Sequence, residues 1–212
     1  MNLSTNVSPH GLRTLRQDKP LIHPLIVRAT HWLNALATVV MIMSGWGIHN
    51  AYPTLPFRFP EIVTLGSGLA GALQWHFAAM WLLAINGAVY LSYGALSGRF
   101  RRKLLPIYPS DIIRDVRAAL SGQLAHDDLS VYNAAQRLLY ASVIGAGILI
   151  VISGIAIWKP VQFRILTTLL GDFDAARLIH FASMTAIVLF LAVHVVMALL
   201  VPSSLRAMIL GR

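Results

Sequence analysis

Four long apolar runs restrict the possible folds of this chain more than any other feature of its sequence. They lie at about 27–48, 72–96, 138–158 and 178–201, and none has Asp, Glu, Lys or Arg in its interior. A helix needs about 20 apolar residues to cross the hydrocarbon core of a bilayer, where it must satisfy its own backbone polar groups. Only 12% of the 212 residues are charged, about half the share of a soluble domain. The sequence therefore predicts an all-α membrane protein with a bundle of four transmembrane helices.

Lysine and arginine are distributed unevenly along the chain. Thirteen of the 17 lie in or beside the N-terminal tail, the loop 97–137 and the C-terminus, and four lie in the loops 49–71 and 159–177. The positive-inside rule assigns the richer side to the cytoplasm. We therefore expect both termini in the cytoplasm and the other two loops in the periplasm of a bacterial inner membrane. The net charge of +9 follows from this topology, so we do not expect nucleic-acid binding.

The chain divides into a cytoplasmic tail at 1–25, one membrane domain at 26–205 and a short tail at 206–212. Within the cytoplasmic loop 97–137, "DIIRDVRAAL" favours an amphipathic helix at the membrane surface. Two short segments also repeat. "HFAAM" at 76–80 returns as "HFASM" at 180–184, and "SGWGI" at 44–48 aligns with "SGIAI" at 153–157, in a register that pairs His31 with Tyr140. This repeat predicts that the first two spans and the last two form similar halves.

Four of the eight histidines lie within the predicted spans: His31, His76, His180 and His194. An ionisable side chain inside a membrane indicates a functional site. Fourteen residues separate His180 from His194, which places them about 21 Å apart on nearly the same helical face. The predicted topology sets His31 at the cytoplasmic level with His194, and His76 at the periplasmic level with His180. We therefore expect two histidine pairs, one above the other.

Each pair requires a ligand, because two facing imidazoles satisfy each other poorly in hydrocarbon. The chain has no cysteine, which excludes thiolate metal sites and covalently attached haem, and neither level offers the further ligands typical of copper or zinc. A haem iron between two imidazoles would take one nitrogen from each and keep no open position, which favours electron transfer over oxygen binding. Individual histidines that only bridge helices by hydrogen bonds stay an alternative. A proton relay would need acidic partners that the spans lack.

Two arginines and a glycine are candidates for the haem surroundings. Arg28 and Arg177 each lie three residues before a span histidine and hence on its helical face, within reach of a haem propionate. Gly45 lies fourteen residues after His31 and would let a bulky ring approach the helix. Three polar residues lie at the cytoplasmic end of the predicted bundle: Arg28, Asn34 and Tyr140.

The other four histidines are weaker candidates. We expect those of the tail and loop to be solvated: His10, His23 and His126. His49, at the outer end of the first span, would lie near the periplasmic haem or a partner protein.

The segments "RATHWLNALATVVMIMSGWGI", "WHF" and "HFASMTAIVLFLAVH" resemble the four-helix dihaem cytochrome b subunits of formate dehydrogenase, nickel–iron hydrogenase and thiosulfate reductase. The resemblance covers about 24–205. It implies two haem b groups, with His31 and His194 as axial ligands of the cytoplasmic haem and His76 and His180 of the periplasmic one. It also implies a periplasmic catalytic partner and a quinone site near the cytoplasmic haem, for which the candidates are Arg28, Asn34 and Tyr140. The chain departs from this family in two ways. The hydrogenase cytochromes usually have a fifth span, which this sequence lacks, and the loop at 50–74 is distinctive.

These features and the resemblance together predict a cytochrome that carries electrons between quinone and a periplasmic redox protein. The resemblance alone makes a molybdenum-cofactor oxidoreductase our first candidate for that partner. The chain would then be the electron-transfer subunit of an oxidoreductase complex. One alternative is an enzyme that needs no partner and oxidises superoxide while reducing quinone, and another is a transporter or membrane anchor without haem. The sequence leaves open the direction of electron flow, the identity of the quinone and the formation of a homodimer.

Overall fold

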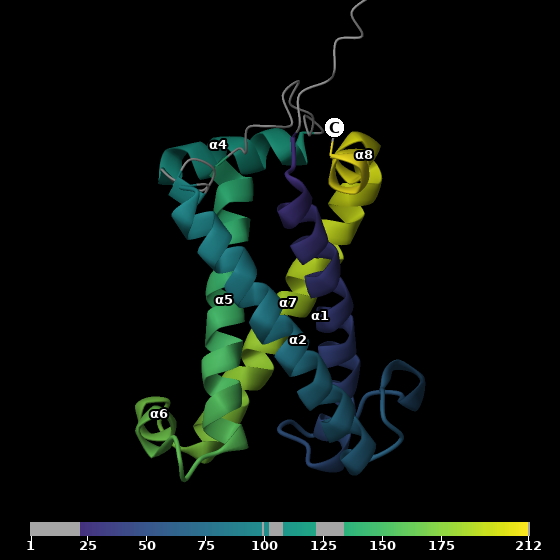
Figure 1. Cartoon of the computed structure of the whole chain (residues 1–212), viewed down its shortest axis with the longest axis vertical. Helices are drawn as coiled ribbons and strands as arrows, with labels where there is room; N and C mark the ends of the chain where they lie inside the picture. Colours follow the sequence, from purple (N-terminus) through teal and green to yellow (C-terminus); the bar gives the residue numbers. More distant parts are fainter. Residues whose placement is uncertain (1–21, 99, 102–107, 122–133, 212) are drawn as a thin grey trace, which may run out of the picture.

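A computed structural model describes residues 22–98, 100–101, 108–121 and 134–211, and these form helices and short connecting loops (Figure 1). The long helices are α1 (Leu25–Ala51), α2 (Leu69–Leu96), α5 (Ala134–Trp158) and α7 (Phe173–Leu200). All four are long and apolar enough to cross a membrane, which confirms the predicted fold class. Most of the predicted N-terminal tail, with His10, lies outside the described residues, as does His126.

Shorter elements lie at the two ends of the bundle (Figure 1). At one end, α4 (Pro109–Leu120) and α8 (Pro202–Leu210) lie near the described C-terminus, and we call this the terminal end. The opposite, loop end carries the loop 52–68 with its 3₁₀ helix η1 (Glu61–Val63), and α6 (Arg164–Leu169). The amphipathic helix predicted in the loop 97–137 is present as α4, and it lies across the end of the bundle.

The long helices pack closely in two pairs, α1 with α2 and α5 with α7. Small side chains are buried in these helices, among them Ala37, Ala72, Ala156 and Ala176, as expected where membrane helices approach without large side chains between them. Large apolar side chains such as Leu36, Leu189 and Val196 are exposed instead, and in a membrane they would face lipid. The pairing of the helices matches the two halves that the sequence repeat predicts.

Contacts at the terminal end join the two ends of the described chain. The Arg28 guanidinium donates to the carbonyl oxygens of Met208, at 3.3 Å, and Ile209, at the last turn of α8. The Ile22 N–H donates to the Gly211 carbonyl oxygen at 2.8 Å. A helix leaves its last carbonyls without intrahelical partners, so Arg28 supplies donors that α8 needs.

His23 is one correction to the sequence-based expectations. Its side chain is buried, with 8% of the residue exposed, so the expectation of a solvated histidine is wrong. The physical reason is that the chain before α1 lies against the end of α8, where the His23 N–H faces the Gly211 carbonyl oxygen at 3.4 Å.

A glycine-rich corner joins the loop 52–68 to α2. Gly66 and Gly68 adopt φ of 111° and 122°, values that L-residues with side chains rarely adopt. Gly71, in the first turn of α2, packs against the Gly66 carbonyl, and a Cβ at Gly71 would overlap this oxygen. The corner therefore fixes where α2 enters the bundle.

We predict that Gly71→Ala destabilises the protein by about 1–3 kcal/mol, because the added methyl forces the corner apart. Gly87→Ala is the matched control on the same helix, since a Cβ there meets no described atom within 4 Å and alanine favours helix. Thermal unfolding in detergent, followed by circular dichroism, measures both. Equal melting temperatures for the two variants would contradict the assignment.

Candidate functional site

The structure brings the four span histidines together in two pairs. His31 of α1 faces His194 of α7, with their ring centroids 5.9 Å apart. His76 of α2 faces His180 of α7 at 6.4 Å. The first pair lies towards the terminal end and the second towards the loop end, and α7 contributes one imidazole to each. These are the pairs that the predicted topology gave.

The separation within each pair suits a metal ion between the rings. A bond from imidazole nitrogen to a transition metal is about 2 Å long, so two such bonds plus half of each ring give about 6 Å between centroids. Among the described residues, no cluster of three or more His, Cys, Asp or Glu could hold a metal. The remaining ligands would have to come from a group other than the protein.

A haem group meets this requirement. Its porphyrin supplies the equatorial nitrogens of the iron, and the protein supplies the axial ligands. An imidazole on each side is the axial set that each histidine pair offers. The donor set and the spacing of both pairs therefore fit haem.

A serine and a glycine of α1 form a cradle for the imidazole of His76. Ser44 Oγ lies 3.0 Å from His76 Nδ1. A Cβ on Gly45 would lie 3.5 Å from His76 Cε1, so the missing side chain leaves the ring room beside the helix. The ring that Gly45 accommodates in the structure is thus an imidazole.

The same arrangement recurs in the other half of the bundle. Ser153 Oγ lies 3.1 Å from His180 Nδ1, and a Cβ on Gly154 would lie 3.2 Å from His180 Cε1. The Ile150 carbonyl oxygen is 3.0 Å from the same Nδ1. The two cradles occupy the aligned "SG" positions of the sequence repeat, which confirms that the halves are structurally related.

These contacts indicate which nitrogen of the His180 imidazole carries the proton. A carbonyl oxygen only accepts hydrogen bonds, so the contact with Ile150 requires a proton on His180 Nδ1. Ser153 donates its own proton to the Leu149 carbonyl oxygen at 2.8 Å and can therefore accept from the imidazole. The neutral ring then keeps a free lone pair on Nε2, the nitrogen available to a metal.

The terminal-end pair has different surroundings. His31 meets the edge of Trp32 at 5.4 Å, and His194 stacks on Phe190 at 5.6 Å. Phe190 in turn meets Tyr140 of α5 at 6.4 Å. The repeat register places Tyr140 where His31 lies in the first half. The two halves are therefore alike at the loop-end pair and differ at the terminal-end pair.

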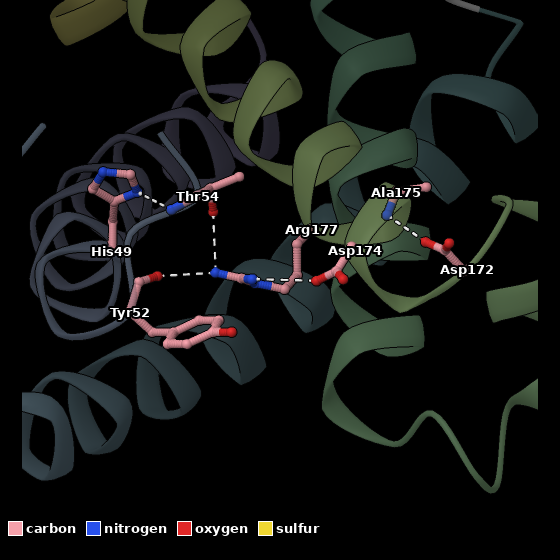
Figure 2. A network of polar contacts seen from close by, with 7 residues as sticks. All are labelled: His49, Tyr52, Thr54, Asp172, Asp174, Ala175 and Arg177. Carbon is pink, nitrogen blue, oxygen red and sulfur yellow. Dashed lines mark hydrogen bonds and ion pairs between the residues drawn. The ribbon is translucent and has the colours of Figure 1, made fainter. Parts of the chain in front are cut away.

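Arg177 joins the start of α7 to the loop after α1 (Figure 2). Its Nη2 donates to the Tyr52 carbonyl oxygen at 2.9 Å and the Thr54 Oγ1 at 3.3 Å, and its guanidinium lies 4.4 Å from the Tyr52 ring centroid. Asp174 pairs with Nη1 at 3.4 Å but is largely exposed. Asp172 caps α7 by accepting from the Ala175 N–H at 2.7 Å. Contact of Arg28 or Arg177 with a haem propionate stays a prediction.

His49 holds the same loop from the other side (Figure 2). The residue is buried, its Nδ1 accepts from the Thr54 N–H at 3.3 Å, and its Nε2 lies 3.1 Å from the Phe57 carbonyl oxygen. Its ring also contacts Phe181, the neighbour of His180, at 5.0 Å. Both ring nitrogens of His49 are therefore engaged by the loop. His49 thus fixes the loop next to the residue that follows His180.

The three quinone candidates lie towards the terminal end, on α1 and α5. Asn34 accepts a hydrogen bond from Asn86 Nδ2 at 2.7 Å, and the same nitrogen donates to the Thr30 carbonyl oxygen at 2.7 Å. Asn86 is buried on α2 and was not among the predicted residues, although an amide within an apolar span was the available signal. Ser44 and Ser153 were also missed, and their signal was the repeated "SG".

Comparison with known proteins agrees with this geometry. Residues 22–211 match the family model described as prokaryotic cytochrome b561. A relative from Azospira oryzae, named putative protein-methionine-sulfoxide reductase subunit YedZ1, is 53% identical over 190 residues. The match covers 90% of this chain and 96% of the relative. The cytochrome b resemblance found in the sequence is thereby confirmed.

We predict that Gly154→Val displaces His180 and lowers the haem content of the purified protein by about half, since its side chain would occupy the space of the imidazole. Gly147→Val is the control on the same helix, because a Cβ there meets no described atom within 4 Å. The pyridine haemochrome assay gives the haem-to-protein ratio. An unchanged ratio in Gly154→Val would show that the cradle is not needed for haem retention.

Proposed function

Because the chain belongs to the prokaryotic cytochrome b561 family of haem-binding membrane proteins, we propose that it carries electrons between the quinone pool and a redox protein outside the bilayer. It is a multi-pass protein of the bacterial inner membrane. The observation that carries the proposal is the presence of two opposed imidazole pairs, separated by about 21 Å of helix α7. One pair would serve each side of the membrane.

Two haem b groups are the cofactors that we propose, held by His31 with His194 and by His76 with His180. Haem supplies one-electron chemistry when bound. The chain's own part is to hold two imidazoles towards each metal position and to exclude other ligands from it. Because each pair would supply both protein ligands of its iron, the sites would favour electron transfer over the binding of a small molecule at iron.

The orientation that we propose follows from charge. Thirteen of the 17 lysines and arginines lie in or beside the two tails and the loop 97–137 of the sequence, so the terminal end would face the cytoplasm. The loop end, with the loop 52–68 and α6, would face the periplasm and receive the partner. Quinone would bind at the terminal end, where Arg28, Asn34 and Tyr140 are the candidate contacts and the Asn86 amide fixes the side chain of Asn34.

The name of the Azospira relative describes a subunit of a reductase for methionine sulfoxide in proteins. We propose a partner of this kind, and a molybdenum cofactor in that partner stays a prediction. The electron count agrees with this choice. Oxidation of a quinol releases two electrons and two protons, and reduction of a sulfoxide consumes two of each to give a thioether and water.

Removal of single ligands tests the haem assignment. We predict two haems per chain in the unaltered protein and one in His194→Ala or His76→Ala, because each variant loses one axial ligand of one pair. Val193→Ala, at an exposed position beside His194, should keep both. The haem-to-protein ratio and the reduced-minus-oxidised spectrum measure this. Complete absence of haem from the unaltered protein would leave only an anchor or transporter.

Electron transfer is tested in proteoliposomes that contain the cytochrome. We expect a quinol analogue to reduce the cytochrome, and the added methionine sulfoxide reductase, supplied with an oxidised protein, to reoxidise it. Vesicles without that reductase are the control and should stay reduced. Superoxide-dependent reduction of quinone by the cytochrome alone, without reoxidation by the reductase, would contradict the proposal and support the superoxide oxidase.

A further inference from the structure

Two buried serine hydroxyls lie beside the loop-end histidines. Ser44 and Ser153 are both 0% exposed, on helices whose surroundings in a membrane are apolar. A hydroxyl is costly to bury in such surroundings unless it is hydrogen-bonded, and alanine is the better helix former. Neither the helices nor their close packing therefore requires a hydroxyl at these positions.

Each hydroxyl acts on the side of the imidazole that faces away from the metal position. Ser44 donates its proton to the Val40 carbonyl oxygen at 2.6 Å, and Ser153 donates to Leu149 at 2.8 Å. The oxygen then presents a lone pair to the histidine Nδ1–H, 3.0 Å away at His76 and 3.1 Å away at His180, where the Ile150 carbonyl oxygen shares the same N–H at 3.0 Å. The imidazole is thus held with Nε2 directed away from its own cradle.

Such a hydrogen bond also changes the ligand itself. When Nδ1–H donates to an acceptor, electron density shifts towards Nε2 and the nitrogen becomes a more basic metal ligand. A stronger donor stabilises the oxidised iron more than the reduced iron, which lowers the reduction potential. The second pair has other surroundings in the part of the chain that the structure describes, where His31 meets the edge of the Trp32 ring and His194 stacks on Phe190.

We propose that Ser44 and Ser153 are positioning residues that present His76 and His180 to the loop-end haem and selectively lower its reduction potential. This inference rests on the proposed haem ligation at that pair. In each repeated "SG", the serine would adjust the reduction potential of the haem, and the glycine would leave room for the imidazole ring.

Redox titration of Ser44→Ala and Ser153→Ala tests the proposal. The potential of the loop-end haem should rise in each variant, with a change in the equilibrium constant for reduction of about two- to tenfold, tenfold being 59 mV for a one-electron couple. The terminal-end haem should keep its potential. Thr185→Ala is the matched control, because its hydroxyl makes the same bond to its own helix, to Phe181 at 3.0 Å, from an exposed position. Repeating the titration in His194→Ala, which should retain only the loop-end haem, assigns the two potentials.

The outcomes separate this inference from the proposed function. Absence of haem from the unaltered protein would refute the function itself. Two bound haems with unchanged potentials in both serine variants, or with equal shifts of both haems, would overturn the role of the serines alone. If an alanine variant fails to accumulate, Ser44→Cys or Ser153→Cys takes its place, because a thiol of nearly the same shape is a weaker acceptor than a hydroxyl. The loop-end potential should rise in these variants too, and an unchanged potential would overturn the proposal.

Discussion

The rest of the structure depends on one constraint, which is that imidazole is expensive in lipid unless both of its nitrogens have partners. Helix α7 carries two such rings, His180 and His194, about 21 Å apart. Each meets a second histidine from the other helix pair. The spacing of both pairs fits a metal between the rings, and the absence of cysteine leaves histidine to hold it. The bundle therefore presents a pair of imidazoles at each of two depths.

The internal repeat explains why the two levels are not equivalent. At the loop end, the halves place His76 and His180 opposite each other, and each ring sits in a serine–glycine cradle from the neighbouring helix. At the terminal end, His31 in the first half corresponds to Tyr140 in the second. A related pair of halves thus gives one symmetric site and one asymmetric site. Different surroundings for the same ligand are a means by which a protein can give two haems different properties.

Sequence alone predicted the four helices and the histidine pairs because hydropathy and helical period are local properties. The burial of His23 was mispredicted, since it depends on α8 returning to the start of α1. Asn86, and the serines opposite His76 and His180, were missed because helix crossing decides which side chains meet. Arg177 was assigned from its spacing to His180, yet its contacts with the loop after α1 depend on a loop conformation that no periodic pattern encodes. Sequence patterns therefore did not predict these contacts between residues that are far apart along the chain.

The most direct measurement of the central claim is an experimental density map of the purified cytochrome in a lipid nanodisc. The account predicts a flat macrocycle between His31 and His194 and another between His76 and His180, each with an imidazole nitrogen on both faces of its iron. Density in which these four side chains contact only protein or lipid would contradict it.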